Sequence, residues 1–240
     1  MPIKRPQFVN GEIYHIVIRA IEGAKLFRDE KDHLRMIHDL FEFNDEDPVL
    51  STYRINQKHN ITRTVLAMFR KKRKVLVEIL AFCLMPNHVH LLVRQIQEGG
   101  ISKFMRKIGA GYGQYYNKKY ERSGHVFQGR YRIVHIENEE QLKTVFVYIH
   151  ANPVSLIVPN WKGEGIDKKD LEKVLKFLEN YKWSSYPDYL GKKNFPSLTN
   201  REFLFRVMGG AENSKEFIQA WLQFKTRLRE TSSLKIVGIE

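Results

Sequence analysis

The stretch VLVEILAFCLMPNHVHLLV, residues 75–93, contains two apolar runs with a turn signal between them. The first run, residues 75–84, is broken by a single charged residue and is typical of a buried strand. The dipeptide Pro86-Asn87 favours a turn. Residues 89–93 then have the apolar character of an antiparallel partner strand. The stretch therefore predicts a β-hairpin.

Two histidines, His88 and His90, stand at the start of the second predicted strand. Residues i and i+2 of a strand project from the same face, so the two imidazoles are expected to point to the same side. Two neutral imidazoles at a strand end can form half of a metal site. The alternative is a pair of hydrogen-bonded surface histidines. The hairpin alone does not decide between these interpretations.

Five further elements surround the hairpin, two of them with plausible N-caps at Asp29 and Asn138. They are recognised by β-branched runs or by apolar residues at helical spacing, and comprise strand 12–21, helix 29–43, helix 101–120, strand 126–136 and helix 138–152. The resulting order, β-α-β-β-α-β-α, predicts an α+β fold with a ferredoxin-like or RRM-like antiparallel sheet and helices on one side. Three glycines within the predicted helix 101–120 suggest close approach by a backbone or a ligand, namely Gly109, Gly111 and Gly113.

The chain divides into a main domain, residues 1–160, and a C-terminal helical extension, residues 161–240. Residues 45–74 fit the pattern of the main domain poorly and are interpreted as an insertion. They include a possible short helix and a run of five cations, which either is solvated or contacts a phosphate backbone. The extension contains three more polar helices, at 168–180, 200–208 and 214–230.

Composition narrows the classes of function. Of the 240 residues, 42% are hydrophobic, which excludes wholesale disorder. Lys and Arg number 40 against 27 acidic residues, and the net charge of +13 favours nucleic acid first and an anionic membrane surface second. The single cysteine, Cys83, excludes a disulfide framework and a thiolate zinc site within one chain. Neither a signal-peptide core nor a membrane-length apolar run is found, so a cytoplasmic protein is expected.

The last predicted helix offers groups that would complete a metal site. Tyr148 and Asn152 are four residues apart, so they lie on the same helix face. An amide oxygen suits Mg²⁺ or Mn²⁺. Tyr148 could equally pack on the sheet, and Asn152 could simply end its helix. Three other tyrosines remain rivals as a nucleophile, namely Tyr112, Tyr115 and Tyr116.

Four motifs together resemble a known family, the single-tyrosine HUH transposases of the IS200-like type. They are LMPNHVHLL at 84–92, Gly129-Arg130-Tyr131, YIHANPV at 148–154 and Trp183-Ser184-Ser185-Tyr186. The chain is most similar to the REP-associated tyrosine transposase branch, and the resemblance covers roughly residues 8–190.

The resemblance implies a reaction and a role for each residue. His88, His90 and Asn152 would hold a divalent metal, Mg²⁺ or Mn²⁺, and Tyr148 would attack a phosphodiester. A 5′-phosphotyrosine and a free 3′-hydroxyl would result. The implied enzyme nicks and rejoins single-stranded, hairpin-forming DNA in the nucleoid. Mobile-element relatives are dimers with the tyrosine helix supplied in trans, whereas the REP-associated branch can be monomeric, so monomer and homodimer both stay open.

Cations near these motifs are candidates for DNA binding through phosphates. They are Arg130, Arg132, Lys103, Arg106 and Lys107. A merely solvated face is the alternative for all of them, and His150 is either structural or a DNA contact.

Two other functions remain to be distinguished. One is a non-catalytic nucleic-acid-binding module on an RRM-like sheet, and the other is a metal-dependent phosphodiesterase that uses water. Geometry separates the first from a tyrosine nuclease, because only the nuclease needs both imidazoles, the Asn152 amide and the Tyr148 hydroxyl to face one pocket.

Overall fold

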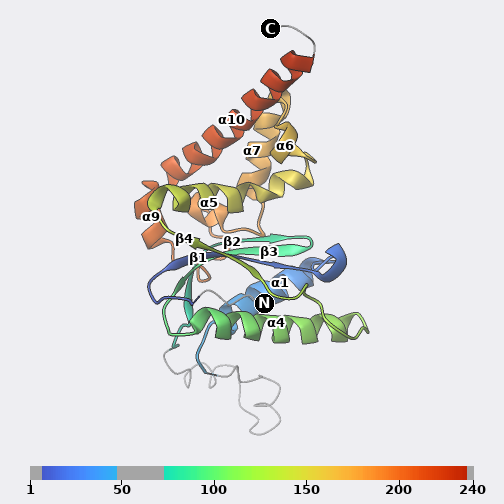
Figure 1. The fold of residues 1–240 in the computed structure, drawn as a ribbon, viewed down its shortest axis with the longest axis vertical. Helices are drawn as coiled ribbons and strands as arrows, with labels where there is room; N and C mark the ends of the chain where they lie inside the picture. The colour runs from blue at the N-terminus through green and yellow to red at the C-terminus, as the bar shows by residue number, and fades with distance from the viewer. Residues whose placement is uncertain (1–6, 48–72, 237–240) are drawn as a thin grey trace.

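The computed structural model describes residues 7–47 and 73–236. A four-stranded antiparallel sheet with the order β2-β3-β1-β4 lies between two layers of helices (Figure 1). The predicted α+β class and element order are confirmed. The elements of this unit are β1 (Ile13–Arg19), α1 (Glu30–Glu42), β2 (Val77–Met85), β3 (His88–Gln95), α4 (Gly100–Lys119), β4 (Arg132–Ile136) and α5 (Glu139–Ala151).

Strand alternation divides the interior into two cores. On β3, Val89, Leu91 and Val93 pack with α1 and α4 on one face of the sheet. Leu92 points the other way and packs with the apolar face of α5 and with the C-terminal helices. Both faces of the sheet are therefore covered (Figure 1), and the prediction of helices on one side is wrong in this respect, because α5 packs on the face opposite α1 and α4. Helix α1 begins at the predicted cap, where Asp29 accepts a hydrogen bond from the backbone N–H of Asp32.

The central hairpin forms as predicted, with β2 and β3 paired from Met85↔His88 outward. Backbone groups hold its turn from outside: the N–H of Ala20 donates to the carbonyl of Asn87 at 2.8 Å, and that of Leu26 donates to the carbonyl of Pro86 at 2.7 Å. The turn is thus fixed in place, and with it the start of β3.

The strand predicted at 126–136 is wrong in its first half, because β4 contains only Arg132–Ile136. Gly124 and Gly129 have positive φ angles of 88° and 53°, which bend the chain away from an extended path. Phe127 makes one isolated bridge with Ala20. The remaining residues before β4 form a loop beside α4.

The glycines of α4 have different neighbours. A Cβ on Gly111 would meet the ring of Phe43, so this glycine permits α1 to pack closely. Gly109 and Gly113 have open space instead, and they line a hollow of about 350 Å³ beside the loop that precedes β4.

The last two residues of the suggested insertion at 45–74 make contacts within the chain. Residues 62–69 and the first three cations of the run at 70–74 lie outside the described residues. Arg73 sits 4.0 Å from the centroid of the Phe41 ring, and Lys74 pairs with Glu46 at 3.4 Å. Both described cations therefore have partners within the chain.

The C-terminal extension packs on α5 and shares its core. Trp161, Val174 and Leu204 belong to the same buried cluster as Phe146 of α5. In the part of the chain that is described, no helix is long and apolar enough to cross a membrane. The helices of the extension are α6 (Trp161–Glu164), α7 (Leu171–Asn180), α8 (Tyr186–Tyr189), α9 (Glu202–Met208) and α10 (Ala211–Ile236).

Candidate functional site

His88 and His90 lie at the start of β3, on the sheet face that α5 covers. Their ring centroids are 4.8 Å apart. His90 is almost fully buried, whereas His88 is partly exposed. The two imidazoles share a face because they are separated by two positions on a regular strand.

Each imidazole uses its Nδ1 within the protein. Nδ1 of His88 lies 2.7 Å from Oδ1 of Asn87, and Nδ1 of His90 lies 2.9 Å from Nε2 of His15 on β1. A carboxamide oxygen only accepts hydrogen bonds, so Nδ1 of His88 carries the proton and its Nε2 keeps a lone pair. Nε2 of His90 is buried without a hydrogen-bond partner among the described residues. Such an orphaned nitrogen is what a metal ligand looks like before its metal is bound.

Burial keeps all three rings neutral. It lowers the pKa of His15 to about 4 and that of His88 to about 4, the latter with help from the nearby positive charges of Arg19 and Lys162. The pKa of His90 lies well below its ordinary value, first because of burial and then because of neighbouring His88 and His15. Neutral imidazole is the form that binds a cation.

Tyr148 and Asn152 complete the arrangement from the end of α5. The Tyr148 ring centroid is 5.6 Å from that of His90 and 5.9 Å from that of His15. Nδ2 of Asn152 donates to the carbonyl of Tyr148 at 2.7 Å. Since this bond fixes the amide, its Oδ1 points away from the helix. Asn152 is buried and helical in conformation, and α5 ends just before Pro153, as predicted.

Lys162 of α6 reaches the same place from the extension. Its amine donates to Oδ1 of Asn152 at 2.8 Å and contacts the hydroxyl of Tyr148 at 3.3 Å. It also lies 4.5 Å from the centroid of the Tyr148 ring. A cation therefore sits between the predicted nucleophile and a predicted metal ligand.

The donor set suits a hard or borderline divalent cation. Across residues 7–47 and 73–236, no group of three or more His, Cys, Asp or Glu side chains is arranged to hold a metal ion. A site here would instead combine two imidazole nitrogens with an amide oxygen, from His88, His90 and Asn152. Nitrogen and oxygen donors without thiolate fit Mn²⁺ and Mg²⁺.

The family model described as "Transposase IS200 like" matches residues 9–152, more than half of the chain. The chain belongs to the IS200-like transposase family. Two solved structures are similar to it at low identity. One is a REP-associated tyrosine transposase bound to a REP hairpin, at 14% identity and a TM-score of 0.47, with 82% of this chain and 90% of that chain covered. The other is a bacterial tRNA(His) guanylyltransferase-like protein in complex with ATP, at 12% identity and a TM-score of 0.36, with 89% and 93% covered. None of the curated proteins compared matches the chain.

The rival tyrosines of this IS200-like transposase lie on the opposite layer. All three belong to α4, and their hydroxyls are engaged there: Tyr112 with the carbonyl of Leu26 at 2.7 Å, Tyr115 with Asp32 at 2.9 Å, and Tyr116 with the carbonyl of Lys25 at 2.6 Å. Burial raises the pKa of Tyr112 and of Tyr115. The sheet separates these phenols from His88 and His90.

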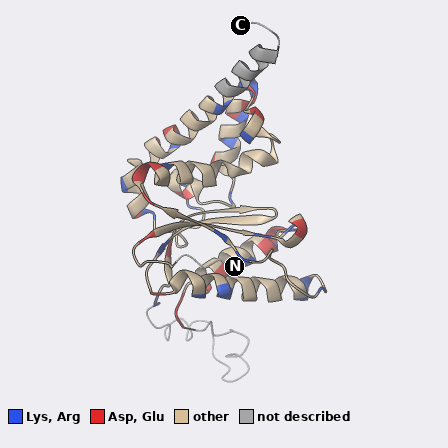
Figure 2. Cartoon of the chain, viewed as in Figure 1, with Lys and Arg blue, Asp and Glu red and all other residues tan. Residues whose placement is uncertain are grey.

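The candidate DNA-binding cations fall into two groups. Arg132 pairs with Val17, which pairs with His90, so Arg132 shares the face and the row of the His pair. Arg130 is exposed in the loop before β4. The other group lies on α4 in the other layer and comprises Lys103, Arg106 and Lys107. The Lys107 amine donates hydrogen bonds to the backbone carbonyls of Asp45 and Asp47. Figure 2 shows Lys and Arg on both helical layers.

The Trp183-Ser184-Ser185-Tyr186 motif extends the sheet at its β2 edge. The N–H of Leu84 donates to the carbonyl of Trp183, and that of Ser185 donates to the carbonyl of Phe82. Nε2 of His150 lies 2.8 Å from Oγ of Ser185 in the core. His150 is therefore structural and cannot contact DNA.

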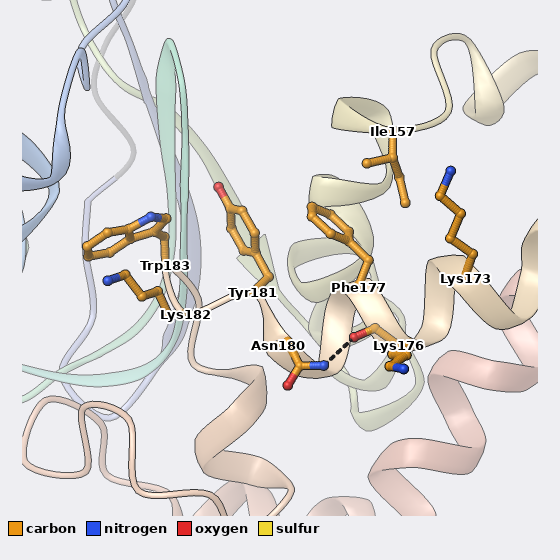
Figure 3. Close-up of a pocket in the computed structure, with 8 residues that line it drawn as sticks. All are labelled: Ile157, Lys173, Lys176, Phe177, Asn180, Tyr181, Lys182 and Trp183. Atoms are coloured by element: carbon orange, nitrogen blue, oxygen red, sulfur yellow. Dashed lines mark hydrogen bonds between the residues drawn. The ribbon is translucent and has the colours of Figure 1, made fainter.

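A hollow of about 470 Å³ lies between α7 and this motif. Figure 3 shows the rings of Phe177, Tyr181 and Trp183 in a row along it, with lysines around them. The indole of Trp183 is already stacked, with ring centroids 4.2 Å from His33 and 6.3 Å from Phe195. These contacts hold the indole within the protein.

Sequence reasoning missed His15 and Lys162. His15 has a visible signal, because it is a polar residue in the apolar first strand, but its contact with His90 depends on strand register. Lys162 has no comparable signal. It lies beyond the matched residues and reaches the site only through the packing of the extension.

Proposed function

We propose that this IS200-like transposase is a metal-dependent, single-tyrosine nuclease that nicks and rejoins single-stranded, hairpin-forming DNA. The observation that carries the proposal is the convergence of one phenol with a pair of neutral imidazoles and an amide oxygen. Tyr148 stands beside His90, and the Lys162 amine joins Oδ1 of Asn152 to the Tyr148 hydroxyl. A nucleic-acid-binding module would have no use for this arrangement.

The chemistry assigned to each group follows from its position. The Tyr148 oxygen forms a bond to phosphorus as the bond between phosphorus and the 3′ oxygen breaks. The phenol loses its proton, and the departing 3′ oxygen gains one. The products are a 5′-phosphotyrosine and a free 3′-hydroxyl, which can reverse the step and rejoin the strand. A divalent cation on His88, His90 and Asn152 would neutralise charge on the phosphoryl oxygens.

The buried partners of the imidazoles keep this site organised. His15 and the Asn87 side chain engage the two Nδ1 atoms, so the two Nε2 atoms would be the ones to hold the cation. Asn152 is oriented by its bond to the Tyr148 carbonyl, which couples the amide ligand to the nucleophile on one helix end.

One chain supplies every group of the proposed site. Tyr148 reaches His90 and His15 of its own chain, which supports a catalytic unit that needs no second subunit. Arg19 pairs with His88 across β1 and β3, and Arg132 lies in the row of His90, so cations border the site on the sheet. We propose that these arginines bind the phosphates of the strand. The preference for hairpins rests on the resemblance of the motifs to the REP-associated branch.

The proposal is tested with hairpin DNA taken from the flanks of the gene and labelled at its 3′ end, so that the label stays with the protein. Wild-type protein with Mn²⁺ or Mg²⁺ is expected to give a covalent adduct that survives denaturing electrophoresis. Tyr148→Phe should give none while binding the DNA within about threefold of wild type, because only one hydroxyl is lost.

A matched control and three contrary results sharpen the test. Tyr131→Phe should keep the adduct, because the Tyr131 hydroxyl lacks a hydrogen-bond partner among the described residues and packs in the other core. An adduct formed by Tyr148→Phe would refute the nucleophile. Cleavage that persists in excess chelator would refute the metal, and cleavage without Tyr148 would indicate attack by water.

A further inference from the structure

The amine of Lys162 contacts both predicted functional groups of α5, although Lys162 lies ten residues beyond the end of the family match at 152. It donates to Oδ1 of Asn152 at 2.8 Å, a full hydrogen bond, and stands 3.3 Å from the Tyr148 hydroxyl. Lys162 is an exposed residue, yet its amine contacts both groups of the site.

Two anchors hold Lys162 in position. The neighbouring Trp161 is 2% exposed and belongs to the core shared by α5 and the extension. The Lys225 amine of α10 donates to the Lys162 carbonyl at 3.0 Å. The packing of the extension therefore fixes the position of Lys162, which does not behave as a free surface residue.

The charge of Lys162 is available to an anionic ligand. No carboxylate forms an ion pair with it in the part of the chain that is described. A phosphorus atom bonded to the Tyr148 oxygen would carry its non-bridging oxygens within reach of the same ammonium. A lysine ammonium is well suited to bind phosphate as a point charge.

The contact with Asn152 has a second consequence. Oδ1 of Asn152 is the oxygen that a divalent cation would use, and it already accepts a bond from an ammonium. Two cations at one oxygen repel each other strongly at such short range. Metal binding must therefore displace the Lys162 amine from Asn152, and the neighbouring Tyr148 hydroxyl is the contact it keeps.

We propose that Lys162 is a catalytic residue contributed by the C-terminal extension, which occupies Asn152 when no cation is bound and binds the scissile phosphate beside Tyr148 when one is. This inference rests on the proposed function. The inference goes beyond that function in two ways. It assigns a role to a residue outside the matched region, and it couples metal binding to the position of that residue.

The test uses the full-length chain and two separate readouts. Mn²⁺ affinity without DNA is measured by the loss of the free-ion paramagnetic resonance signal, and the rate of adduct formation is measured at saturating Mn²⁺. Lys162→Met should bind Mn²⁺ at least about threefold more tightly and form the adduct at least about tenfold more slowly, because both effects follow from removing one close charge. Lys162→Arg should restore most of the rate.

Matched variants separate local from general effects. Arg19→Met also removes a positive charge near His88 but does not touch Asn152, so it should tighten Mn²⁺ less than Lys162→Met. Lys173→Met removes an exposed charge of the extension and should leave both readouts unchanged. Thermal unfolding checks that each variant is folded.

The results separate a failure of the role of Lys162 from a failure of the proposed nuclease function. If either readout of Lys162→Met equals that of wild type while Tyr148→Phe forms no adduct, the role of Lys162 is refuted and the tyrosine nuclease stands. If Tyr148→Phe still forms the adduct, the proposed function fails first.

Discussion

Nε2 of His15 lies 2.9 Å from Nδ1 of His90, so a buried side chain of β1 orients a proposed metal ligand of β3. The two rings are nearly parallel, with centroids 5.2 Å apart. His15 is 7% exposed, and burial lowers its pKa to about 4, so it is neutral and able to accept a hydrogen bond from His90. A side chain of the neighbouring strand therefore engages Nδ1 of His90.

Replacing His15 with Leu should weaken Mn²⁺ binding by about ten- to a hundredfold, the usual cost of losing the partner of a metal-bound histidine. The fold should persist, because Leu fills similar space. His15→Gln retains an acceptor and should recover part of the affinity, whereas His125→Gln changes an exposed histidine of a loop and should have no effect. Titration of the three variants with Mn²⁺ measures these affinities. Wild-type affinity in His15→Leu would contradict a role of His15 in orienting His90.

Arg132 and Lys103 should differ as DNA contacts because they lie on opposite sides of the sheet. Arg132→Met should lower affinity for single-stranded DNA severalfold and reduce the slope of log affinity against log salt by about 0.7, the contribution of one phosphate on a single strand. Lys103→Met should change neither. Fluorescence anisotropy over a series of salt concentrations measures both quantities, and a larger effect of Lys103→Met would place the DNA on α4 instead.

Acid should destabilise the protein partly through His150. Burial lowers its pKa to about 3, below the ordinary value of about 6.5 that applies to the unfolded chain. As the pH falls below about 6.5, the unfolded state binds a proton that the native state does not, so the free energy of unfolding decreases by up to about 1.4 kcal/mol per pH unit.

This slope offers a direct check. In His150→Leu the contribution is absent, so the free energy of unfolding, measured by urea denaturation between about pH 7 and about pH 5, should decline less steeply than in wild type. Equal slopes in the two proteins would show that His150 is protonated in the native state at little cost.

The period of the strand made the His pair predictable, and the helical period did the same for Tyr148 and Asn152. Both patterns are local, and the family resemblance joined them. The partners of these residues are not local. His15 meets His90 only through the pairing of β1 with β3, and Lys162 arrives through the packing of Trp161 in a core that a linear pattern does not reveal.

The difference between local patterns and contacts in space also explains the wrong strand start at 126 and the uncertain role of the glycines in α4. Residues 126–131 include apolar side chains typical of a strand, but the positive φ of Gly129 bends the chain out of an extended path. Phe127 makes only one isolated bridge, so these residues form a loop. The glycines of α4 suggested close approach, and only the structure shows that Gly111 faces Phe43 while Gly109 and Gly113 face a hollow. Neighbours in space decide what such residues do.

The most direct test of the account is to identify the amino acid that becomes linked to DNA. Wild-type protein is reacted with hairpin DNA and Mn²⁺, the adduct is digested with protease and nuclease, and the modified peptide is sequenced by mass spectrometry. Attack by Tyr148 predicts a nucleotide joined through its 5′-phosphate to Tyr148 and a free 3′-hydroxyl on the released strand. A nucleotide on any other residue, or one joined through its 3′-phosphate, would contradict it.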